Sequence, residues 1–140
     1  MFAFRKSNTH PVAPIIKTLP SKASTTYKLG DALILSGGFL DKATGGTKPE
    51  YICACNYVAP AEDMEPIAVY LISPGSEWDT TFSAAATSIN EGDVVTINTD
   101  AAQVTATATG GVAKILKKHG TGASGEGVTV TFVDPAPSES

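Results

Sequence analysis

Clusters of turn-forming residues recur at short intervals along this sequence and leave little room for a long helix. The clusters combine Gly with Asp, Asn, Ser, Thr or Pro, and they separate short apolar or alternating segments. This pattern is typical of short antiparallel strands joined by tight turns. We expect strands near residues 31–36, 39–43, 50–58, 66–73, 78–83, 93–98, 103–108, 111–117 and 127–133.

Two of these segments also indicate how the strands are layered. In residues 127–133 apolar and polar side chains alternate, so the valines and the phenylalanine would share one face and the threonines the other. In residues 66–73 both faces would be apolar. A strand with two apolar faces belongs in the centre of a sandwich or barrel, or under an interface.

Composition points to a single all-β domain. Charged residues make up 17% of the 140 residues, whereas roughly 25% is usual in soluble domains. The 13 glycines favour tight turns, and the frequent Thr, Val and Ile favour strands. We therefore predict a compact β-barrel or sandwich of short antiparallel strands at residues 26–134. A surface so poor in charge fits a protein that works in an assembly, or a neutral threonine-rich surface, and composition leaves both open.

A repeated Gly-Asp pair suggests that the domain contains two similar β units. Gly30-Asp31 and Gly92-Asp93 each precede a strand, a hairpin partner and two further strands in the same order. We infer a possible internal duplication of residues 30–73 and 92–133. Each pair is interpreted as a turn, in which Gly takes a positive φ and the Asp carboxylate accepts a backbone N–H. A catalytic carboxylate pair would need a His or metal partner that the sequence does not supply.

The first 25 residues form a predicted extended, basic, proline-rich arm, and residues 135–140 a flexible tail. Residues 1–30 hold five cations and no acid, while the remaining residues hold all 14 acids and five lysines. Such an arm would become ordered only against an acidic partner, namely a neighbouring copy, another protein or nucleic acid. A solvated leader is the alternative. The residues proposed to bind the partner are Phe2, Phe4, Arg5, Lys6, Ile15, Ile16, Lys17, Leu19 and Lys22.

No set of residues in the sequence specifies a reaction, so we expect no catalysis, cofactor or metal. Residues 120–125 match G-x-G-x-x-G, but a dinucleotide site needs a helix after the loop, and a strand is predicted there. Cys53 and Cys55 lack the further Cys or His ligands of a zinc site, since His10 lies in the arm and His119 in a loop. We also predict no signal peptide and no membrane-spanning segment.

Trp78 and Phe82 would share one face of a strand at residues 78–83. Such aromatic side chains usually belong to a core, but one of them could serve as a surface anchor. A carbohydrate-binding β module is therefore an alternative function.

Residues 27–133 resemble the small β-rich decoration, or cement, proteins of tailed-phage capsids. The likeness lies in the order and spacing of Tyr27 with Gly30-Asp31, PEYICACNYVA, PIAVYLISPGSEW, INEGDVVTI and GVTVTFV. This resemblance implies a non-enzymatic protein that binds the major capsid protein on the outside of the virion and stabilises the shell. It also implies self-association, as a homotrimer, and synthesis in the host cytoplasm. A neck or tail component is the other structural alternative, and neither nucleic acid nor a membrane is an expected partner.

Overall fold

The computed structural model describes residues 1–6, 16–61, 65–73 and 75–135. Within these ranges all regular structure is β, so the all-β prediction is confirmed. The strands form two five-stranded antiparallel sheets and one two-stranded sheet. They are β1 (Ala3–Lys6), β2 (Ile16–Pro20), β3 (Thr26–Tyr27), β4 (Ala32–Ser36), β5 (Phe39–Lys42), β6 (Tyr51–Cys53), β7 (Tyr57–Val58), β8 (Pro66–Leu71), β9 (Glu77–Thr81), β10 (Val94–Val95), β11 (Ala113–Lys118) and β12 (Gly127–Phe132).

The first barrel, residues 16–71, is built from the sheet β2-β8-β6-β4-β5. A parallel bridge between Ser21 and Leu40 links its two edge strands and closes the sheet. The small sheet β3-β7 covers one opening, where the Tyr27 hydroxyl donates to the Leu40 carbonyl at 2.7 Å. The buried core of this barrel consists of Tyr27, Leu33, Leu40, Cys53, Ala59, Ile67 and Val69.

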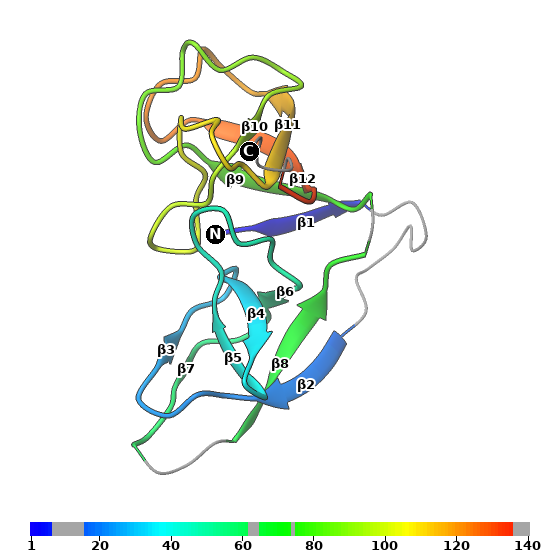
Figure 1. Cartoon of the computed structure of the whole chain (residues 1–140), viewed down its shortest axis with the longest axis vertical. Coiled ribbons are helices and arrows are strands. Elements are labelled where there is room, and N and C mark those ends of the chain that lie inside the picture. The colour runs from blue at the N-terminus through cyan, green and yellow to red at the C-terminus, as the bar shows by residue number, and fades with distance from the viewer. Residues whose placement is uncertain (7–15, 62–64, 74, 136–140) are drawn as a thin grey trace, which may run out of the picture.

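The second barrel, residues 77–132, is built from β9-β12-β11-β10, and β1 is added along the outer edge of β9. Val104 bridges both Phe82 and Ile97, which closes this sheet in the same way. Figure 1 shows the two barrels stacked along the long axis of the molecule, with β1 lying between them.

Two predicted strands differ in kind from the structure, and a third, at residues 93–98, is shortened to Val94–Val95. Residues 103–108 are not a continuous strand, because only Val104 forms bridges there. Residues 50–58 are two strands in different sheets, since the chain leaves the first barrel after Cys53 and then pairs Tyr57 with Tyr27. Both differences arise from closing a small barrel, which requires short strands and sharp changes of direction.

The two barrels have the same strand order and the same register. Lys17 pairs with Val69 in the first barrel, and Trp78, 61 positions later, pairs with Val130 in the second. Four of the five pairs of β2-β8 match the four pairs of β9-β12 at this offset. Likewise β4-β6 matches β10-β11 at an offset of 62. The equivalent pairings therefore begin at residues 17 and 78, before the start of the predicted repeats 30–73 and 92–133.

The two Gly-Asp pairs occupy equivalent turns at the start of β4 and β10. Gly30 has φ 89° and Gly92 has φ 96°. Asp31 Oδ2 accepts the Lys28 N–H at 2.9 Å, and Asp93 Oδ2 accepts the equivalent N–H three residues before it, also at 2.9 Å. The positive φ explains why glycine is found at both positions.

The leader differs from the prediction of a separate arm that is ordered only against a partner. Its described residues supply strands to both barrels: β1 extends the second sheet and β2 is an integral strand of the first. Phe2 is 2% exposed and belongs to the main core. The boundary expected at residue 26 is absent from this arrangement, because apolar leader residues gain more by packing on their own chain than by staying in solvent.

Candidate interaction surfaces

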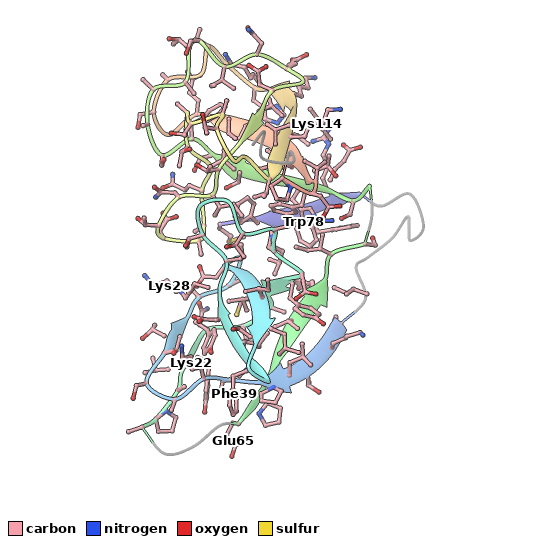
Figure 2. All side chains as sticks on the ribbon, viewed as in Figure 1. Lys22, Lys28, Phe39, Glu65, Trp78 and Lys114 are labelled. Atoms are coloured by element: carbon pink, nitrogen blue, oxygen red, sulfur yellow. The ribbon has the colours of Figure 1, made fainter. Side chains whose placement is uncertain are left out.

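The aromatic residues of the leader lie at the junction of the two barrels. The ring of Phe2 packs edge-on against Phe132 with centroids 5.3 Å apart, and Phe4 packs in the same way on Trp78 at 5.4 Å. Tyr70 of the first barrel lies 6.4 Å from Trp78. Figure 2 shows Trp78 at the level where the two barrels meet. The Phe2 N–H also donates to the Gly30 carbonyl, in the turn before β4, at 2.9 Å. β1 and the Tyr70–Trp78 contact therefore join the two barrels within one chain.

Trp78 and Phe82 are not surface anchors. Their exposed fractions are 1% and 0%, and both lie in the main core. The prediction that they share a face is consistent with the alternating burial of β9. That face points into the second barrel, because β9 curls around the core that β11 and β12 also line. Neither ring is therefore available to stack on a sugar.

The outer face of β9 and its neighbours forms a charged wall on the second barrel, defined by Arg5, Glu77, Asp79, Lys114, His119 and Thr129. Arg5 lies 3.9 Å from Glu77 and 3.6 Å from Asp79. The Thr129 hydroxyl donates to Asp79 at 2.6 Å, and His119 Nε2 lies 2.8 Å from the same hydroxyl. The alternation in residues 127–133 places Thr129 on the face opposite the core, but no local pattern indicates Asp79, because its neighbours come from β1, β12 and the bend after β11.

The remaining leader residues are divided between core and surface. Ile16 is 63% exposed and Lys17 is also exposed, both on β2. Leu19 packs against the core of the first barrel. Lys22 forms an exposed ion pair with Asp41 at 3.3 Å. Lys6 ends β1 with Glu77 as its register partner, and Ile15 lies outside the described residues.

An apolar pocket of about 230 Å³ lies beside the N-terminus, where β1 meets the first barrel. Phe2, Phe4 and Tyr70 contribute to its lining. Met1 and Leu29 contribute as well and are among the exposed large apolar residues.

Two candidate sites from the sequence, Cys53 and the glycine-rich loop at residues 120–125, form structural contacts. Burial raises the pKa of the Cys53 thiol to about 12, which leaves it protonated and unreactive near neutral pH. In the loop at residues 120–125, the Gly122 N–H donates to the Glu126 carboxylate at 2.9 Å. A neighbouring carboxylate thus occupies the position that a phosphate would need.

No group of three or more His, Cys, Asp or Glu side chains in the described ranges is placed to hold a metal ion. None of the described residues forms a helix with the length and apolar character needed to cross a membrane.

No family model and no curated protein sequence matches this chain. Among solved structures, the chain is similar to the N base of head fiber gp8.5 of bacteriophage phi29, with a TM-score of 0.58 and 15% sequence identity. The alignment covers 89% of this chain and 100% of that one. At this identity the likeness concerns the fold, and it extends over both barrels.

Proposed function

We propose that this chain is a non-enzymatic structural protein attached to the head of a bacteriophage. The observation that carries the proposal is the fold likeness to a head fiber base over the full length of that chain. The resemblance noted in the sequence points to the same part of the particle from separate features, namely the order of its turns and strands.

We further propose that the chain binds the outer surface of the capsid and stabilises the shell, with the major capsid protein as its partner and a homotrimer as its assembly. The junction supports this role, because Ile52 and Tyr70 of the first barrel pack into the same core as Phe2 and Trp78 and so hold the two barrels as one body. A stiff body loses little conformational entropy on docking. Several copies that engage one lattice then add modest affinities.

The carbohydrate-binding alternative has lost its main support. Its candidate rings, Trp78 and Phe82, are both buried, so a sugar could reach them only if the second barrel opened. We do not pursue it further.

Quantitative mass spectrometry of purified virions tests the location, and removal of the gene tests the role. We expect mass spectrometry to find the protein in intact particles and immunogold labelling to place it on the head. Particles that lack the protein should release their DNA at a lower temperature. Labelling of the neck or tail would assign the alternative structural role. Absence from purified particles would refute both.

A further inference from the structure

Beyond the bridge between Ser21 and Leu40, the outer edge of β2 at Ile16–Thr18 is open in the part of the chain that the structure describes. β2 is the terminal strand of its sheet and pairs only with β8 along residues 16–20. Ile16, Lys17 and Thr18 are all exposed, with Ile16 at 63%. Proteins commonly protect an open edge, since its unpaired N–H and C=O groups can pair with another chain. A largely exposed isoleucine does not protect this one.

The second barrel shows how the equivalent edge is completed. There β1 pairs along β9, with Ala3 opposite Asp79, Phe4 opposite Trp78 and Lys6 opposite Glu77. At the offset of 61 residues, Glu77, Trp78 and Asp79 correspond to Ile16, Lys17 and Thr18. The three exposed residues of β2 are therefore the equivalents of the three that pair with β1.

The backbone of β2 presents suitable groups at this edge. The Ser21 N–H donates to Glu65 O at 3.0 Å, on the β8 side. Because the direction of the backbone N–H and C=O groups alternates from residue to residue along an antiparallel strand, those of Leu19 and Lys17 also point toward β8. The backbone N–H and C=O groups of Thr18 and Ile16 then point outward, and no strand among the described residues pairs with them on that side. Pro20 has no N–H and ends the edge on that side.

The side chains at this edge favour a different partner strand from β1. Arg5 of β1 lies beside Glu77 and Asp79, but the equivalents in β2 are Ile16 and Thr18, which offer no carboxylate. Lys17 replaces Trp78, and none of the ion pairs found among the described residues includes it. A strand that carries an acid opposite Lys17 and an apolar residue near Ile16 would complement this edge.

We propose that the edge of β2 at Ile16–Thr18 binds an extended, acidic segment of another protein by β-strand addition. A second copy of β1 is a poorer fit, because β1 is basic and already occupies the edge of β9. The proposal stands on the matched registers of the two barrels and does not depend on attachment to a phage head.

Fluorescence polarisation with the full chain and three labelled hexapeptides tests the proposal. The peptides alternate Thr and Val and carry Glu, Thr or Lys at one central position. We expect the Glu peptide to bind best, the Lys peptide to bind worst, and their difference to shrink in high salt. Failure of all three peptides to bind would overturn the proposal.

Two variants of Thr18 separate the backbone contribution from the side chain. Thr18→Pro removes an outward N–H that β8 does not use and should weaken binding of the Glu peptide at least ten-fold. Thr18→Val, the matched control, keeps the N–H and should bind as the parent does. Circular dichroism would check that both variants fold. Equal binding by Thr18→Pro and the parent would contradict strand addition.

A charge reversal tests the chemistry of the partner without changing the backbone. Lys17→Glu lies at an exposed position, so the fold should persist, and the variant should prefer the Lys peptide over the Glu peptide. An unchanged preference would refute the acidic partner. Light scattering adds a further outcome: a dimer that Thr18→Pro dissociates would identify a second copy as the occupant and overturn the assignment to another protein.

Discussion

The outer walls of the two barrels are built from equivalent residues that differ in polarity. In the first barrel the wall carries Ile16, Ile52 and Tyr70, and its central part lies against the junction. The equivalent residues of the second barrel are Glu77, Lys114 and Thr131. Lys114 is exposed, as Figure 2 shows at the outside of the upper body.

The interior positions of the same strands change much less. Ile67 and Val69 of β8 correspond to Val128 and Val130 of β12, and all four are buried. Register and interior side chains therefore maintain the barrel, while the polarity of the outward-facing side chains varies with their environment. The apolar wall of the first barrel reflects contact with the second barrel, and the charged wall reflects contact with water.

The largest expected difference between equivalent positions is that between Trp78 and Lys17. Trp78→Ala should destabilise the protein by about 3–5 kcal/mol, because it empties the junction and leaves Phe4 and Tyr70 without a partner. Lys17→Ala, the matched control at an exposed position, should change stability by about 0.5 kcal/mol or less. Urea denaturation followed by circular dichroism measures both. Similar losses for the two variants would show that the junction is not a stabilising element.

The second largest difference in stability is expected for Asn substitutions at the two turn aspartates, Asp31 and Asp93. Asp31 is 2% exposed and forms an ion pair with Lys42 at 2.6 Å. Asp31→Asn leaves the lysine without its carboxylate and should cost about 2–4 kcal/mol. Asp93→Asn retains an acceptor at an accessible turn and should cost about 0.5 kcal/mol or less. A double-mutant cycle with Lys42→Met measures the coupling directly, and a coupling near zero would contradict the first estimate.

Alanine substitution at the two turn glycines should give a smaller difference. Gly92→Ala strains a positive φ without any close neighbour and should cost about 1 kcal/mol. At Gly30 the added Cβ would also collide with the Met1 side chain, so Gly30→Ala should cost more. Thermal unfolding of the two variants ranks them. If Gly92→Ala is the less stable of the two variants, the Met1 side chain moves aside in Gly30→Ala without loss of stability.

The last difference depends on pH and concerns Cys53, whose equivalent in the second barrel is Ile115. Burial raises the pKa of the Cys53 thiol from 9.0 to about 12, so the unfolded chain releases this proton at a lower pH than the folded one. The stabilisation is complete below pH 9 and declines as pH rises toward 12. Cys53→Ile should remove that part of the decline, as measured by urea midpoints between pH 8 and pH 10.5. An identical decline in parent and variant would exclude this contribution.

Much of the fold could be predicted from local patterns. The turns at Gly30 and Gly92 depend on a few neighbouring residues, and the alternation in β12 identifies its buried face, so both can be predicted from the sequence. The equivalence of β2 and β9 could not be predicted from the sequence. IKTLP and EWDTT share no pattern, because the two strands place different chemistry on equivalent positions.

The all-β character, the positions of the turns and the two Gly-Asp repeats follow from residues that are close along the chain, and local patterns therefore predict them. Contacts between distant segments do not follow in this way: they place β1 between the two barrels, bury Trp78, and bring Asp79 and His119 to one wall. The physical reason is that burial and charge pairing depend on which distant segments meet: Phe2 packs on Phe132, from the other end of the chain. The open edge of β2 became visible for the same reason, because it is defined by comparison with an edge that β1 completes 61 residues later.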